Sequence, residues 1–272
     1  MLNAGPEGAQ APVVLMNFTH VYEQETFYRQ QPHVWIDCTD LSGVCGYCDT
    51  PAMREIRRRI AAYGPVGVHF IDSGNYHYVS RFWTEKIRRE FVLVLFDNHT
   101  DLQPSRFGPI MSCGSWVRDA LDTNPLLRKV VLLGVTDAYG ERLEKELARE
   151  PAYAPRLRAF SHAALNQKST WQELADEHYR LPVYLSIDKD VLRPEDDLTD
   201  WNQGDMSLSV LKNFLDLLIR HHEIIGVDIC GECSRLCGKG LVAIRMNDTV
   251  NLQLMRFLKN CQTRRPTANT SL

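Results

Sequence analysis

The sequence predicts an α/β fold in three layers, with a mostly parallel sheet between two layers of helices. Six apolar, β-branched runs have the length of strands, and most are unbroken, which is typical of strands buried on both faces. They are Val13 to Phe18, Val66 to Ile71, Phe91 to Phe96, Lys129 to Val135, Val183 to Ile187 and Ile224 to Ile229. Segments with helical periodicity lie between them: Pro51 to Ala62, Phe82 to Arg89, Ser115 to Leu121, Glu141 to Arg149, Thr170 to Tyr179, Leu208 to Arg220 and Val250 to Leu258. This alternation indicates a parallel sheet covered by helices on both sides.

Composition narrows the class of protein further. The 272 residues are 44% hydrophobic and 24% charged, with a formal net charge of −3, which excludes disordered and collagen-like chains. Basic residues are scattered in small groups, so no nucleic-acid partner is expected. No apolar run approaches the roughly 20 residues of a membrane span, and the N-terminus lacks the features of a signal peptide. The sequence thus predicts a cytoplasmic protein with a small-molecule partner.

No repeat or long linker divides the chain, so we expect one domain over residues 1–261 and a disordered tail over 262–272. Six of the eight cysteines fall into two groups, Cys38, Cys45 and Cys48, and Cys230, Cys233 and Cys237. Each group contains a Cys-x-x-Cys pair that could hold a structural zinc ion. The favoured interpretation is reduced cysteines packed as small apolar side chains, as expected in a reducing compartment.

The ends of the apolar runs are unusually polar, and in open α/β sheets ligands bind at the carboxyl ends of the strands. Asp97, His99 and Asp101 follow one run at spacings that would align them in an extended segment. Asp188 and Asp190 follow another. Four carboxylates at one sheet edge repel one another unless cations neutralise them. Together with His77 from a third run, they predict two divalent ions, with Mn²⁺ expected and Fe²⁺, Co²⁺ or Zn²⁺ as competitors.

These motifs resemble those of the ureohydrolase superfamily of arginases, agmatinases and formiminoglutamases. The matching segments are Gly74-Asn75-Tyr76-His77, Asp97-Asn98-His99-Thr100-Asp101 and Ser186-Ile187-Asp188-Lys189-Asp190. The resemblance implies an arginase-like α/β/α fold with an eight-stranded parallel sheet, a dinuclear manganese centre and a homo-oligomer. It further implies that Asp97 and Asp188 bridge the ions, that His77 and Asp101 complete one site, and that His99 and Asp190 complete the other.

The same resemblance implies hydrolysis of a linear C–N bond in a guanidino, formimino or related amidine substrate. Two ions about 3.5–4 Å apart can lower the pKa of a shared water to about 7, so that a bridging hydroxide attacks the trigonal carbon. Glu232 resembles the late family glutamate that holds the cationic substrate, although its spacing is one residue longer. Cys113 stands where arginases and agmatinases carry a proton-shuttling histidine.

Two alternatives remain open at this stage. Metal-dependent deacetylases share the overall fold, but they use one zinc ion and usually lack the carboxylate at the place of Asp101, so this residue favours the dinuclear enzyme. The substituted shuttle and the altered motif before His77 also fit a metal-binding protein that has lost turnover. Counting bound ions and assaying hydrolysis would separate these alternatives.

Overall fold

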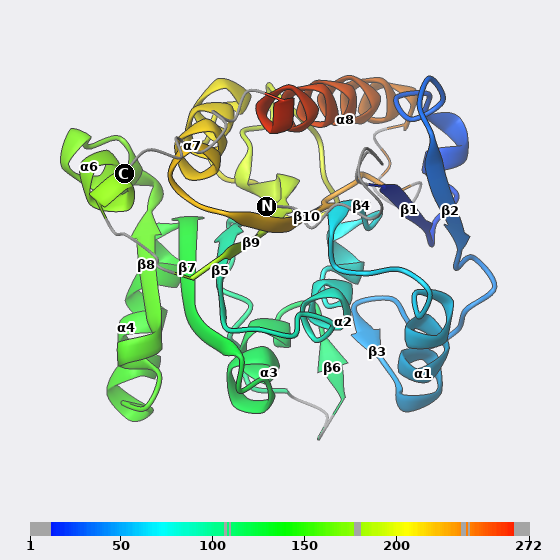
Figure 1. Cartoon of the computed structure of the whole chain (residues 1–272). Coiled ribbons are helices and arrows are strands. Elements are labelled where there is room, and N and C mark those ends of the chain that lie inside the picture. Colours follow the sequence, from blue (N-terminus) through cyan, green and yellow to red (C-terminus); the bar gives the residue numbers. More distant parts are fainter. Residues whose placement is uncertain are drawn as a thin grey trace, which may run out of the picture.

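The computed structural model describes residues 12–105, 108, 110–176, 181–234, 238 and 240–263. Its main sheet has eight strands in the order β2-β1-β4-β10-β9-β5-β7-β8, and every neighbouring pair is parallel (Figure 1). The strands are β1 (Val13–Asn17), β2 (His33–Asp37), β4 (Gly67–Phe70), β5 (Phe91–Phe96), β7 (Leu127–Val135), β8 (Leu157–Ser161), β9 (Val183–Asp188) and β10 (Ile224–Cys230). The predicted fold class and the eight-stranded parallel sheet are confirmed.

Helices cover both faces of this sheet (Figure 1). They are α1 (Thr50–Arg59), α2 (Val79–Thr84), α3 (Trp116–Thr123), α4 (Asp137–Arg149), α5 (His162–Leu165), α6 (Lys168–Asp176), α7 (Leu208–His221) and α8 (Gly240–Thr263). One hydrophobic cluster joins the sheet to α1, α2, α3 and α4, and a second joins it to α5, α6, α7 and α8. Strand β5 supplies Leu93 and Leu95 to the first cluster and Val92 and Val94 to the second. Burial on both faces therefore explains the unbroken apolar runs.

The predicted elements differ from the observed ones mainly at the sheet edges. Strands β2 and β8 were not predicted, because as edge strands they carry exposed residues that interrupt the apolar pattern. Helix α2 begins and ends earlier than the predicted segment, and α8 begins ten residues before Val250. Because α8 continues to Thr263, the tail expected from residue 262 is helical at its start, and residues 264–272 lie outside the described part.

Three features of the fold shape the polar end of the sheet. Strands β4, β10, β9 and β5 are neighbours, so the segments that follow them meet at one edge. Within the described ranges, three 3₁₀ helices follow strands at this end, Tyr22–Gln24, Gly74–Tyr76 and Lys189–Val191, whereas a fourth, Ala154–Arg156, leads into the start of β8. A short antiparallel pair of β3 (Tyr47–Cys48) and β6 (Met111–Ser112) joins two loops.

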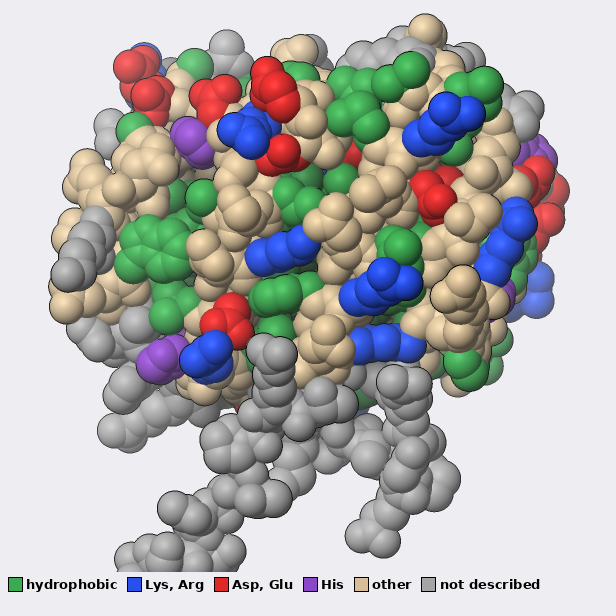
Figure 2. Space-filling model, turned by 90° about the horizontal axis from the view of Figure 1, so that it is seen from above, with side chains coloured by type: hydrophobic (Ala, Val, Ile, Leu, Met, Phe, Trp, Pro, Cys, Tyr) green, Lys and Arg blue, Asp and Glu red, His purple; other side chains and the backbone are tan. Residues whose placement is uncertain are grey.

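Over the face seen in Figure 2, Lys and Arg side chains are interleaved with hydrophobic and acidic ones. Within the described ranges, no helix combines the length and the apolar character that crossing a bilayer requires.

Candidate metal centre

Three carboxylates from two segments surround Nδ1 of the His77 imidazole. Nδ1 of His77 lies 3.3 Å from Oδ2 of Asp97, 3.1 Å from Oδ2 of Asp101 and 3.4 Å from Oδ2 of Asp188. All four side chains are buried. Donor atoms bound to one metal ion are typically about 3–4 Å apart, given metal–ligand distances of about 2.0–2.3 Å. The spacing of these atoms therefore suits a single ion.

A second group adjoins the first and shares Asp97 with it. Nδ1 of His99 lies 2.8 Å from Oδ2 of Asp190 and 3.4 Å from Oδ1 of Asp97. The two oxygens of Asp97 thus face different imidazoles, as a carboxylate that bridges two ions would require. Asp188, the other predicted bridge, faces His77 through Oδ2, while its Oδ1 accepts the backbone N–H of Asp190 at 3.0 Å.

The loop after β5 brings its three ligands together by bending rather than by staying extended. The strand ends at Phe96, and Asp101 adopts a left-handed conformation with φ of 50°. Oδ1 of Asp97 accepts the backbone N–H of His99 at 2.6 Å, which stabilises the turn. The predicted alignment of Asp97, His99 and Asp101 along an extended segment is wrong. Instead, the turn places the carboxylate of Asp101 beside the ring of His77 and the ring of His99 beside the carboxylate of Asp190.

Two further side chains orient the ligands. Nε2 of His77 lies 2.9 Å from the hydroxyl of Ser186, so the Nε2–H tautomer leaves the Nδ1 lone pair facing the carboxylates. Nε1 of Trp116, the first residue of α3, donates to Oδ2 of Asp101 at 2.7 Å. The sequence prediction missed Trp116, since nothing in the pattern of the chain connects the start of α3 to the loop after β5.

In the absence of metal ions, burial and mutual repulsion raise the pKa values of the clustered carboxylates. Burial, followed by repulsion from Asp190 and Asp97, raises the pKa of Asp188 to about 7. Burial and the charge of Asp97 raise the pKa of Asp190 to about 6. Although burial opposes it, hydrogen bonding to Asp190 and Asp97 raises the pKa of His99 to about 12. A bound cation would reverse this preference for protonation.

Two buried atoms at the centre of the cluster have no hydrogen-bond partner among the described residues. They are Nδ1 of His77 and Oδ2 of Asp97, which face each other. Buried polar atoms of this kind are rare unless an ion or water satisfies them. The donor set of imidazole nitrogens and carboxylate oxygens suits divalent Mn, Fe, Co or Zn. The residues present therefore fit a pair of divalent cations.

The ligands line the floor of a cavity of about 400 Å³. Its walls include Tyr47, Asn75, Gln103, Cys113, Tyr139 and Trp201. Tyr139 and Trp201 meet the ring of His99 edge-on, with ring centroids 5.0 Å and 5.7 Å away. A Cβ at position 74 would lie 2.9 Å from Oδ2 of Asp188 and 3.0 Å from Cδ1 of Trp201, so a larger residue than glycine would displace these side chains.

Cys113, predicted to replace the shuttle histidine, lines the cavity in the structure. Its thiol is mostly buried, and burial, assisted by the charge of Asp101, raises the pKa of Cys113 to about 12. In the metal-free protein this thiol therefore stays protonated at neutral pH.

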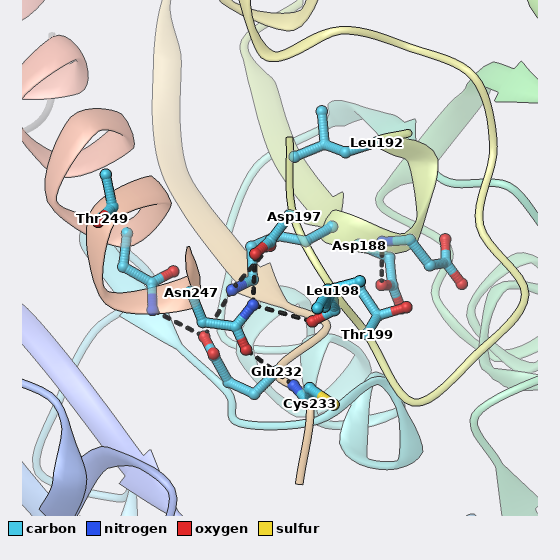
Figure 3. Close-up of polar contacts among 12 residues, drawn as sticks. Asp188, Leu192, Asp197, Leu198, Thr199, Glu232, Cys233, Asn247 and Thr249 are labelled. Carbon is cyan, nitrogen blue, oxygen red and sulfur yellow. Dashed lines mark hydrogen bonds and ion pairs between the residues drawn. The ribbon is translucent and has the colours of Figure 1, made fainter. Parts of the chain in front are cut away.

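The predicted position of Glu232 needs correction. Its side chain is fully buried away from the cavity, where Oε1 accepts from Lys189 at 2.8 Å and from Asn251 at 2.8 Å. Figure 3 shows Glu232 beside the cluster around Asn247 and Asp197, with Asp188 apart from it. Glu232 does not lie where it could hold a substrate. Among the described residues, the cavity contains no carboxylate beyond the four aspartates of the two ligand groups.

The cysteine groups do not form the alternative zinc site within the described residues. Cys38, Cys45 and Cys48 are free thiols, and none of them belongs to a cluster of metal-type ligands. In the second group, Cys230 is free and Cys233 is disulfide-bonded, so the prediction of reduced cysteines is wrong for Cys233. Cys237 lies outside the described residues.

Comparison with solved structures extends the description of the fold. The chain is similar to a formiminoglutamase variant from Trypanosoma cruzi with Mn²⁺, at 13% identity, a TM-score of 0.68 and coverage of 97% of each chain. It is also similar to agmatine ureohydrolase of Thermoplasma volcanium, at 15% identity and a TM-score of 0.67, covering 97% of this chain and 94% of that one. Formimidoylglutamase from Bacillus subtilis matches at 12% identity and a TM-score of 0.66, with 94% and 90% covered. At these identities the likeness establishes a shared fold.

Comparison with known sequences identifies the family to which the chain belongs. An uncharacterized protein from Thermotoga maritima is 31% identical over 247 residues, which cover 90% of this chain and 88% of that one. The sequence profile of the Arginase family matches residues 12–230. Because this match spans most of the sheet and all six predicted ligands, the chain belongs to the Arginase family.

Proposed function

We propose that this protein is a dinuclear metal-dependent hydrolase of a linear C–N bond in a guanidino, formimino or related amidine substrate. The observation that carries this proposal is the pair of adjoining ligand groups that share Asp97. One group would hold an ion through His77, Asp97, Asp101 and Asp188. The other would hold an ion through His99, Asp97 and Asp190, with Asp188 as a second bridge. Family membership supports hydrolysis as the type of reaction.

When bound, the two ions would neutralise the carboxylates and acidify a water that serves as the nucleophile. Mn²⁺ is the expected metal, since oxygen ligands outnumber nitrogen ligands in the proposed set. The chain's own residues would supply orientation. Ser186 fixes the ring of His77, and Trp116 fixes the carboxylate of Asp101, so the ligand atoms converge before an ion arrives.

The cavity walls would serve binding and proton transfer. The aromatic rings of Tyr139 and Trp201 stand beside His99 and would restrict water around a planar substrate. We retain Cys113 as the proposed proton-transfer group, because it lines the same cavity as the ligands. With Glu232 turned away and the four aspartates assigned to the ions, neutral wall groups such as Asn75 and Gln103 would bind the substrate.

The two alternatives are less well supported. A deacetylase-like site with one ion would not explain why Asp101, whose position lacks a carboxylate in those enzymes, lies 3.1 Å from Nδ1 of His77. A protein without turnover would not require an open cavity at the ligands, and the family match favours neither alternative. The predicted homo-oligomer and the absence of a nucleic-acid partner remain predictions.

The direct experiment loads the purified protein with Mn²⁺ and measures bound ions together with release of urea, ammonia or formamide. A panel of guanidino, formimino and related amidine compounds should include at least one that is hydrolysed, with two ions bound per chain. Two bound ions with no hydrolysis across the panel would favour the protein without turnover. One ion per chain, with release of acetate from acetylated amines, would favour the deacetylase-like alternative.

Trp116 offers a test of the proposed ligand Asp101. Trp116→Phe removes the indole donor to Asp101, and loss of such an orienting hydrogen bond typically weakens metal binding about 10–100-fold. Trp83 is a matched control, because it is equally buried but its Nε1 has no hydrogen-bond partner in the described structure. Competition with a metal-chelating dye should show weaker Mn²⁺ binding in Trp116→Phe and unchanged binding in Trp83→Phe. Equal affinities would contradict the role assigned to Asp101.

A further inference from the structure

Cys230 lies against the ligand group of His77. It is the last residue of β10, and its backbone is in register with Asp188 at the end of the neighbouring strand β9. Its Sγ atom lies 3.3 Å from Oδ2 of Asp188, the oxygen that faces His77. Ligand atoms of His77, Asp188 and Cys230 all lie within 4.8 Å of one another. The thiol is therefore placed where a further donor to the same ion would stand.

The surrounding structure holds the sulfur in this position. Cys230 is 1% exposed. The next residue, Gly231, has a φ of 98°, and a Cβ there would lie 2.6 Å from Oδ1 of Asp188, so the chain turns sharply after the cysteine. The imidazole of His77 belongs to the same group of candidate ligands as the sulfur, and its buried Nδ1 atom makes no hydrogen bond by geometry within the described structure. Because this nitrogen also faces oxygens of Asp97, Asp101 and Asp188, it indicates a cation site beside the thiol independently of the cysteine itself.

We propose that Cys230 binds, as a thiolate, the ion held by His77, Asp101 and Asp188. This inference rests on the proposed dinuclear centre and adds a ligand to it. On coordination the S–H bond breaks, the proton passes to solvent, and a sulfur lone pair forms the bond to the ion. No electrons are transferred.

The two ion positions would then differ in chemistry. The position at His77 would contain nitrogen, oxygen and sulfur donors, whereas the position at His99 would contain only nitrogen and oxygen donors. Thiolate is a soft ligand that favours Zn²⁺, Co²⁺ and Fe²⁺ over Mn²⁺. A chain with one soft and one hard position is suited to a mixed metal pair.

The competing interpretation is that Cys230 stays a thiol and only donates a hydrogen bond to Asp188. Cys230→Ser separates the two, because a serine hydroxyl can still donate to Asp188 but is not a soft thiolate ligand. Cobalt(II) is the probe, since a bound thiolate produces a near-ultraviolet sulfur-to-cobalt absorption band that oxygen and nitrogen ligands do not. Cys113→Ser is the matched control, because Cys113 lines the same cavity without belonging to the group of His77, Asp188 and Cys230.

We expect the wild-type protein to bind two cobalt ions and to show this band. The band should be lost in Cys230→Ser and kept in Cys113→Ser. The ratio of Zn²⁺ to Mn²⁺ affinity should fall roughly tenfold or more in Cys230→Ser, because a soft donor is removed. Should Cys230→Ser fail to fold, Cys230→Ala tests the same loss of sulfur with a smaller side chain. The wild-type and Cys113→Ser spectra can be interpreted without either variant, because they show whether a thiolate other than that of Cys113 binds cobalt.

Two outcomes would overturn the inference, and they differ from failure of the proposed function. Two bound cobalt ions without the band, or a band that survives in Cys230→Ser, would show that Cys230 is not a ligand while leaving the dinuclear centre intact. A folded wild-type protein that binds no cobalt, zinc or manganese would overturn the dinuclear centre and the thiolate ligand together.

Discussion

Asp97→Asn is expected to abolish hydrolysis and to weaken binding of both metal ions by at least about 100-fold. Loss of a side chain that only orients a metal ligand already weakens metal binding by up to about 100-fold, and loss of a ligand should cost more. The reason is geometric. Oδ2 of Asp97 faces His77 at 3.3 Å and Oδ1 faces His99 at 3.4 Å, so one carboxylate would serve both ions. Elemental analysis of the purified protein would count the ions, and the amidine assay would follow turnover.

The variant should remain folded, because asparagine keeps the size of the side chain while removing one charge from a crowded cluster. Circular dichroism and urea unfolding of metal-free protein would verify this. Asp205→Asn is the matched control, since Asp205 is an exposed carboxylate that does not line the cavity, and it should keep two ions and full activity. A folded Asp97→Asn protein that retains both ions would refute the bridging role.

Lys189→Met is expected to lower the free energy of unfolding by about 3–5 kcal/mol at neutral pH, the usual cost of leaving a buried charge unpaired. Nζ of Lys189 lies 2.8 Å from Oε1 of Glu232 and 3.2 Å from Oδ2 of Asp197, and all three side chains are fully buried. Within the described ranges, Lys189 is the only cation paired with either carboxylate. Urea denaturation would measure the loss.

Lys145→Met is the control for replacing an ammonium group by a thioether, since Lys145 is exposed on α4, and its effect should stay within about 0.5 kcal/mol. The double variant Lys189→Met with Glu232→Gln should be more stable than Lys189→Met alone, because one of the two unpaired charges is then absent. If Lys189→Met and the wild-type protein had the same urea concentration at the midpoint of unfolding, the ion pairs of Lys189 would contribute nothing to stability.

The sequence was most informative about the middle of the sheet. The runs that form β4, β5, β9 and β10 are apolar without interruption because helices cover both faces. Polar residues directly after such runs must gather at one edge, which is why His77, Asp97 and Asp188 could be predicted to meet. The edge strand β2 could not be recognised, since its exposed residues resemble a loop.

What the sequence did not reveal depends on side-chain direction and on contacts between distant segments. Glu232 follows a strand end as the candidate metal ligands do, but the turn at Gly231 and the buried ammonium of Lys189 hold its side chain away from the cavity. Lysine is among the residues that are least often buried, so nothing in the sequence marks Lys189 as the buried partner of Glu232. Trp116 reaches Asp101 from another element, a contact that only the packing of α3 determines.

The partners of Lys189 also bear on how the protein is made. Asn251 on α8 donates to Glu232 at 2.8 Å and to Glu25 at 2.9 Å, so residues far apart in the chain complete one buried cluster. Lys189 lies between the proposed ligands Asp188 and Asp190. As a chain emerges from the ribosome, its N-terminal parts are available first. The segment that carries these proposed ligands therefore cannot acquire its full support until translation has passed Asn251, which makes this polar end of the sheet one of the last regions to mature.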